Sequence, residues 1–100
     1  MGMNMRDLQR LQQKMIKMQE ELEVAQFTGT AGGGAVTITM TGKFEIVGVK
    51  IDPEAFNADD IYELEVMVKA AAKDAFDRVN TEQQKLLTNA TGGVKIPGLF

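Results

Sequence analysis

The sequence predicts an α+β fold with the element order α-β-β-β-α, and three observations support this prediction. An amphipathic segment with apolar residues at alternating spacings of three and four comes first. A segment in which apolar residues alternate with threonine follows, and a long run without glycine or proline comes third. A chain of 100 residues can form one domain with one modest core. We therefore expect a single domain over residues 1–100, with long helices at its ends and a small sheet between them.

Residues 1–26 are expected to form a helical arm. The apolar side chains that recur along it are Leu8, Leu11, Met15, Met18 and Leu22. At 100° per residue they fall within an arc of roughly 80°, the narrow seam of a helix that packs against another helix. A second arc of similar width holds the basic residues Arg6, Arg10, Lys14 and Lys17. The arm therefore has one face for packing and another that is positively charged.

Residues 27–52 are expected to form a sheet. Val36, Ile38 and Met40 alternate with threonines, which is typical of a strand with one buried face. A weaker strand is expected just before it, over residues 26–30, and Thr41-Gly42-Lys43 is expected to form a turn. The sheet is expected to end at Asp52-Pro53.

The strand expected over residues 44–51 changes its hydrophobic phase midway. Phe44 and Ile46 are assigned to one face, and Val47, Val49 and Ile51 to the other. A change of phase inside one strand indicates a β-bulge, here near residues 47–48.

Residues 57–91 are expected to form the second, longer helix. Asn57 is a good N-cap, and the acidic residues at positions 59 and 60 suit a first helical turn. An apolar stripe runs from Ile61 to Leu86. No glycine or proline follows until Gly92-Gly93, which permits about 34 helical residues and a length of roughly 50 Å. Residues 92–100 are expected to form an irregular tail.

Two long apolar surfaces predict a homodimer. A compact globule of this length has a radius of gyration of roughly 13 Å, so it cannot cover a helix of roughly 50 Å. A small sheet also leaves unpaired backbone groups at its edges. Joining two sheets across a two-fold axis would bury one edge and enlarge the core.

The composition excludes most catalytic and metal-binding chemistry. Cysteine, histidine and tryptophan are absent, which rules out thiolate nucleophiles, histidine bases and sites built from Cys and His. The seven acidic residues from Glu45 to Glu65 lack EF-hand spacing and are expected to cap helices or face solvent. The glycine-rich segment 29–34 precedes a strand, so we expect a turn and not a phosphate loop. We expect no enzyme, metal, cofactor or small-molecule substrate.

The cytoplasm is the expected location. No apolar run approaches the roughly 18 residues that a membrane span requires. The first residues also lack the apolar core of a signal peptide. No membrane partner is expected.

The distribution of charge leaves two hypotheses for function. The net charge is −3, yet residues 1–18 carry four basic side chains and one acidic side chain. Such a stripe attracts anions to the end of the helix, which favours contact with nucleic-acid phosphates. It contains no aromatic residue, so stacking on single strands is not expected. The alternative is the solvated face of an acidic coiled-coil adaptor that recruits a protein without binding DNA directly.

Five segments, taken together and in order, resemble the YbaB/EbfC family of bacterial nucleoid-associated proteins. They are Met18-Gln19-Glu20-Glu21-Leu22, Gly33-Gly34-Ala35-Val36-Thr37-Ile38-Thr39, Thr41-Gly42-Lys43, Val49-Lys50-Ile51-Asp52-Pro53 and Ala70-Ala71-Ala72-Lys73-Asp74-Ala75. The resemblance covers nearly the whole chain.

The resemblance implies a tweezers-like homodimer with helical arms and a shared antiparallel sheet. It also implies binding of double-stranded DNA without catalysis, and a cytoplasmic, nucleoid-associated location. In the family the arms are held to grip the duplex. The matching positions in this chain are Arg6, Arg10, Lys14 and Lys17, with Arg78 and Lys85 from the long helix.

Overall fold

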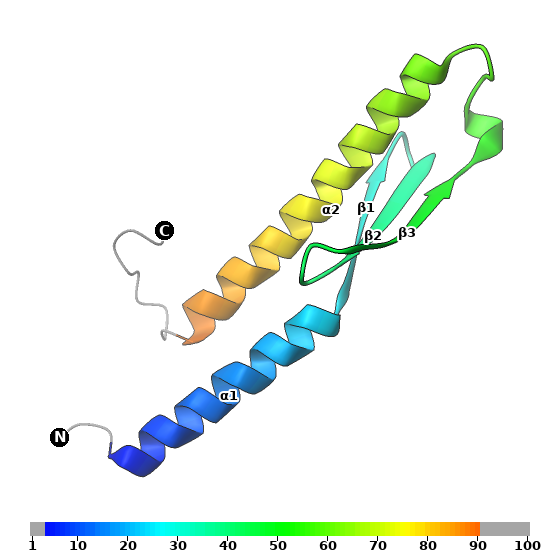
Figure 1. The fold of residues 1–100 in the computed structure, drawn as a ribbon. Helices are drawn as coiled ribbons and strands as arrows, with labels where there is room; N and C mark the ends of the chain where they lie inside the picture. Colours follow the sequence, from blue (N-terminus) through cyan, green and yellow to red (C-terminus); the bar gives the residue numbers. More distant parts are fainter. Residues whose placement is uncertain (1–3, 91–100) are drawn as a thin grey trace.

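A computed structural model describes residues 4–90 and confirms the order α-β-β-β-α (Figure 1). Its elements are α1 (Met5–Val24), β1 (Gln26–Ala31), β2 (Val36–Thr41), β3 (Ile46–Ile51), the short 3-10 helix η1 (Pro53–Ala55) and α2 (Ile61–Ala90). The tail expected over residues 92–100 lies outside the described residues.

The three strands form an antiparallel sheet in the order β1-β2-β3, and α2 crosses one face of it. The alternation along β2 is confirmed, since Val36, Ile38 and Met40 are buried and the intervening threonines are partly exposed. The buried side chains of α2 that share this core are Ala71, Ala75 and Val79. Small residues on α2 let the helix lie close to the branched side chains of β2.

Gly29 in β1 allows the closest approach between sheet and helix. A Cβ atom at this position would collide with the backbone nitrogen of Ala75 and the carbonyl oxygen of Ala71. The adjacent Thr30 donates its backbone N–H to Oδ2 of Asp74 at 3.0 Å. Glycine and carboxylate together fix β1 against the middle of α2.

The predicted bulge is confirmed at Val47, but the predicted faces of β3 are wrong. Thr39 pairs with Gly48 and Met40 pairs with Ile46, so Val47 is the extra residue. Ile46, Val49 and Ile51 are therefore opposite the buried residues of β2 and share their face. Because the bulge adds one unpaired residue at Val47, Ile46 lies on the same face of the sheet as Val49 and Ile51.

The third strand begins at Ile46, not at Phe44. Phe44 has φ 63°, a left-handed conformation, and its N–H donates to the carbonyl oxygen of Thr41 at 2.9 Å to close the turn. The turn directs the aromatic ring toward α2, where its centroid lies 4.8 Å from that of Phe76.

The long helix begins at Ile61, later than the predicted start at residue 57. The predicted cap, Asn57, instead closes a turn, because its Oδ1 accepts the N–H of Asp59 and its carbonyl oxygen accepts the N–H of Asp60. Asp60 performs the capping role, with its Oδ1 accepting the N–H of Glu63 at 3.2 Å.

The protomer is elongated. Its dimensions are 68 × 25 × 17 Å and its radius of gyration is 18.7 Å, against roughly 13 Å for a compact chain of this length. Among the helices and strands of residues 4–90, α1 contacts only α2 and β2. Figure 1 shows α1 extending beyond the sheet, with its first residues at one end of the molecule and the β3–α2 connection at the other.

Candidate nucleic-acid interface

The first helix is an arm fixed at one end. At its start, Oδ1 of Asn4 accepts the N–H of Asp7 at 2.9 Å, so the free end is capped. At its root, the chain packs closely on the turn after β2: the N–H of Gly42 donates to the carbonyl oxygen of Ala25 at 3.2 Å, and a Cβ on Gly42 would strike the backbone of Leu22. The helix therefore holds its outer residues away from the body as a regular rod.

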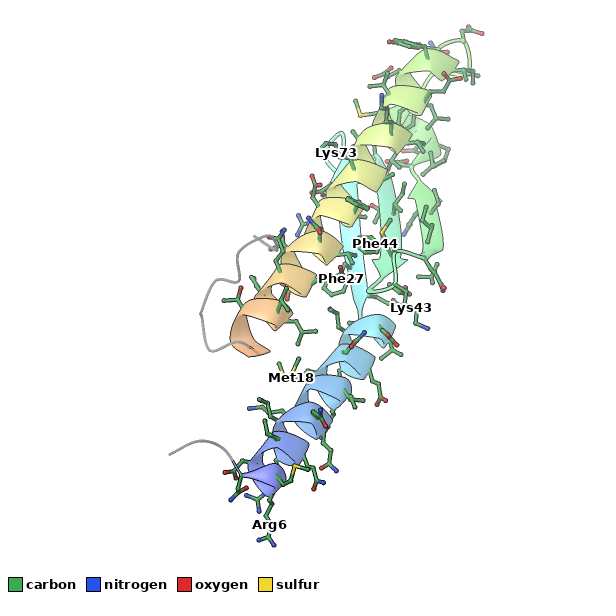
Figure 2. The ribbon with its side chains drawn as sticks, turned by 60° about the vertical axis from the view of Figure 1, so that its left-hand side comes forward. Arg6, Met18, Phe27, Lys43, Phe44 and Lys73 are labelled. Carbon is green, nitrogen blue, oxygen red and sulfur yellow. The ribbon has the colours of Figure 1, made fainter. Side chains whose placement is uncertain are left out.

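The basic stripe on this arm is exposed along its full length. Its members are Arg6, Arg10, Lys14 and Lys17, and all four are exposed to solvent. The stripe extends over roughly 17 Å of helix, about 120° around the axis from the apolar seam. Figure 2 shows the side chain of Arg6 pointing away from the molecule at the tip of α1. Within residues 4–90, none of these four side chains forms an ion pair.

The opposite end of the molecule is acidic. Five carboxylates and no Lys or Arg lie in residues 52–63, which run from the end of β3 to the first turn of α2 (Figure 1). The structure thus separates the charges that sum to −3 in the sequence. The free end of α1 is locally positive, although the whole chain is negative.

The structure places Arg78 and Lys85 on a different element, in a different electrostatic setting. Both line a shallow groove between α2 and β1, with a volume of about 530 Å³. Nε of Arg78 lies 3.4 Å from Oδ2 of Asp74, and Nζ of Lys85 lies 3.2 Å from Oε1 of Glu82. Each cation is already paired with a carboxylate on its own helix. Exposed pairs of this kind contribute little to stability because water and salt screen them, so phosphate can compete for these cations.

Two ionisable groups on α2 have shifted pKa values with clear causes. The hydrogen bond from Nζ of Lys73 to Oδ2 of Asp77, at 2.9 Å, raises the pKa of Lys73. The N–H of Thr30 stabilises the ionised form of Asp74 and lowers the pKa of this carboxyl group, and Arg78 adds to the effect. Both groups are charged at neutral pH, so Asp74 holds Arg78 while it anchors β1.

The apolar surface of β3 was not singled out as an interface by the sequence analysis. Ile46, Val49 and Ile51 lie on the helix side of the sheet, yet α2 covers only β1 and β2. Val49 is 54% exposed. The sequence shows three branched apolar residues in this strand. Only the position of the bulge shows that all three lie on one face.

The seam of α1 is also incompletely covered. Leu8 is 42% exposed and Met15 is 39% exposed, and no residue of α1 is buried. Figure 2 shows the side chain of Met18 directed toward the C-terminal end of α2. The sheet edge and the arm therefore both present apolar side chains to solvent in the isolated protomer.

Residues 4–90 contain no group of three carboxylates arranged to hold a metal ion. In the same part of the chain, no helix is long and apolar enough to cross a membrane.

The sequence of this chain matches a known protein family over almost its whole length. The sequence profile of the YbaB/EbfC DNA-binding family matches residues 1–94. A nucleoid-associated protein of Dictyoglomus turgidum is 44% identical over 97 residues, covering 96% of this chain and 93% of the relative. A nucleoid-associated protein of Pelotomaculum thermopropionicum is 39% identical, covering 100% of this chain and 95% of the relative.

A solved structure has a similar fold. The crystal structure of an uncharacterized protein from Helicobacter pylori, HP0035, superimposes with a TM-score of 0.67 at 24% sequence identity. The match covers 88% of this chain and 97% of that chain.

Proposed function

The chain belongs to the YbaB/EbfC DNA-binding family, and on that premise we propose that it is a non-catalytic, nucleoid-associated protein that binds duplex DNA through the tips of its α1 arms. The proposed location is the nucleoid, in the cytoplasm. The proposed contacts are to phosphates and not to base edges.

The observation that carries this proposal is the exposed basic stripe on the projecting end of α1, which forms no ion pair within residues 4–90. Lys and Arg side chains that neutralise DNA phosphates release condensed counterions, which favours binding without regard to sequence. The stripe residues need not give up a carboxylate partner within residues 4–90 to do so. Arg78 and Lys85 are proposed as secondary contacts, since each must first exchange its carboxylate for a phosphate.

A homodimer is part of the same proposal. β3 is an edge strand with an uncovered apolar face, and a strand paired with its own copy across a two-fold axis runs antiparallel to it. Such a pairing would extend the sheet and give hydrogen-bond partners to the free backbone groups of β3. It would also cover Ile46, Val49 and Ile51. It would also supply two arms, so that up to eight stripe cations face the duplex.

The test is a titration of labelled duplex DNA at several salt concentrations. With all eight stripe cations engaged, the slope of log K against log salt should be about −7, at roughly −0.9 per phosphate contact. The variant Arg10→Gln/Lys14→Gln should halve that slope and weaken binding to unrelated duplexes equally. Glutamine is a good helix former, so the arm should remain folded.

The matched control is Lys69→Gln/Lys73→Gln, which removes the same charge from an exposed face of α2. The slope of log K against log salt for this control variant should stay near that of the parent protein. If the arm variant leaves both affinity and slope unchanged, the stripe is a solvated face, and the adaptor without direct DNA binding becomes the better hypothesis.

A further inference from the structure

Three elements meet at Gly42, in the turn between β2 and β3. The N–H of Gly42 donates to the carbonyl oxygen of Ala25, the residue that ends α1, at 3.2 Å. The carbonyl oxygen of Gly42 accepts Nε2 of Gln83, a partly buried residue of α2, at 2.9 Å. Gly42 is itself buried, and a Cβ atom there would strike the backbone of Leu22. One residue therefore joins the root of α1 to the second half of α2.

The turn that contains Gly42 is held in one orientation. The N–H of Phe44 and the N–H of Lys43 donate to the carbonyl oxygen and to Oγ1 of Thr41, at 2.9 and 3.2 Å. The ring of Phe44 lies 4.8 Å from that of Phe76, between centroids. Phe76 and Gln83 are roughly 10 Å apart along α2. Because α2 contacts the turn at two separate points, the orientation of the turn follows that of α2.

Direct packing between α1 and α2 does not fix the angle of the arm. A groove of about 770 Å³ lies between the two helices, and both polar and apolar side chains line it. No residue of α1 is buried, and Met15 is 39% exposed although it lines the groove. The angle therefore depends on the hydrogen bonds at the root of the arm.

The length of the arm makes that angle important for the basic stripe. The 20 residues of α1 extend over roughly 30 Å, so a rotation of about 10° at the root would move the free end by roughly 5 Å. Such a movement exceeds the axial spacing of about 3.4 Å between successive phosphates of one DNA strand. A small change at Gly42 would thus change which phosphates the stripe can reach.

We propose that Gln83 is a positioning residue, whose hydrogen bond to Gly42 sets the angle between the α1 arm and the body. Gln83 carries no charge and acts through Gly42 and Ala25 without touching DNA. If the donor is removed, the carbonyl group of Gly42 needs another partner, and the joint loosens. The inference rests on the proposed function only for its consequence in DNA binding, because the angle itself can be measured without DNA.

Distances between two spin labels test the angle. The protein has no native cysteine, so cysteines can be introduced and labelled at the exposed positions Gln13 on α1 and Lys69 on α2. Mixing with an excess of unlabelled protein ensures that each distance belongs to one protomer. Gln83→Met keeps a long unbranched side chain and a good helix former but has no donor. We expect it to roughly double the width of the distance distribution, as loss of the one neutral hydrogen bond at the joint implies.

Two further variants separate positioning from a general effect on stability. Gln83→Lys retains a donor for the Gly42 carbonyl, so its distance distribution should stay close to that of the parent protein. Gln84→Met is the matched control, because it makes the same change at the exposed neighbouring residue of α2. Circular dichroism establishes that every sample is fully folded at the temperature of the measurement. A parental distribution in Gln83→Met, or equal broadening in Gln84→Met, overturns the proposal.

Titration of labelled duplex DNA measures the consequence for binding. Gln83→Met retains all four stripe cations, so a loss of affinity reports their placement and not their number. We expect its Kd to rise by about fivefold, the order expected when one neutral hydrogen bond no longer holds the arm, whereas Gln84→Met should bind like the parent protein. Broadened distances with unchanged affinity overturn the positioning role in DNA binding. A parent protein that does not bind duplex DNA contradicts the proposed function, while the spin-label distances still decide whether Gln83 sets the angle of the arm.

Discussion

The backbone N–H of Thr30 donates to Oδ2 of Asp74 at 3.0 Å and links β1 to a helix that begins thirty residues later in the chain. The hydrogen bond favours the carboxylate over the carboxylic acid and lowers the pKa of Asp74. A residue in the middle of α2 therefore makes the attachment of the sheet sensitive to acid.

Asp74→Asn should reduce stability at neutral pH and make unfolding less dependent on acid. The folded-state pKa lies below the ordinary value of about 3.9, so the stabilisation is complete above that value and is lost as the pH falls through the folded-state pKa. Urea unfolding of both proteins from pH 7 to pH 2.5 should show a constant difference that closes only below about pH 4. A difference that persists unchanged to pH 2.5 would contradict this account.

Gly29→Ala should destabilise the protein by about 1–3 kcal/mol, the usual range for an overpacked site. The added methyl group meets the backbone of α2 at Ala71 and Ala75, and backbone cannot move aside as a flexible side chain can. Gly48→Ala is the control, since the nearest heavy atom to its Cβ would be Cβ of Thr39 at 3.9 Å. Urea midpoints compare the two variants, and equal midpoints would refute the close approach.

Val49→Lys should raise the dimer dissociation constant at least tenfold, a change of about 1.4 kcal/mol. Burial of a valine contributes about 1.5–3 kcal/mol, and a two-fold interface would place two lysines near each other. Val24→Lys is the matched control, at a site 77% exposed at the end of α1. Sedimentation equilibrium measures both. A parent protein that is monomeric at micromolar concentration would remove the proposed interface altogether.

Arg78→Gln/Lys85→Gln should weaken DNA binding less than Arg10→Gln/Lys14→Gln does. Both pairs remove two positive charges, but Arg78 and Lys85 are partly neutralised by Asp74 and Glu82. The change in salt slope should be less than half of that for the arm variant. An equal or larger change would move the principal contact surface from α1 to α2.

The sequence predicted the elements well where a local pattern decides the structure. The alternation around Ile38 reflects burial against α2, and the phase change in residues 44–51 revealed the bulge at Val47. The first residue of the long helix was not predictable in this way. Asn57 and Asp60 are both good caps, and only the turn between them determines which one begins the helix.

The candidate site was predicted in part. Helical periodicity placed Arg6 to Lys17 on one face, and all four residues are exposed there. Periodicity could not reveal that Arg78 is held by Asp74, because such pairing depends on side-chain conformation. It also assigned Ile46 to the wrong face of β3, because a bulge shifts the phase of a strand by one residue at a position that the sequence locates only approximately.

The separation of charge along the protomer determines how far its net charge matters for DNA. At physiological ionic strength the Debye length is about 8 Å, whereas the basic and acidic ends belong to a molecule 68 Å long. A phosphate at the tip of α1 is therefore shielded by salt from the carboxylates around Asp59. As salt is diluted and the screening length grows toward about 30 Å, the acidic end should begin to oppose approach, so the affinity should rise less steeply at very low ionic strength.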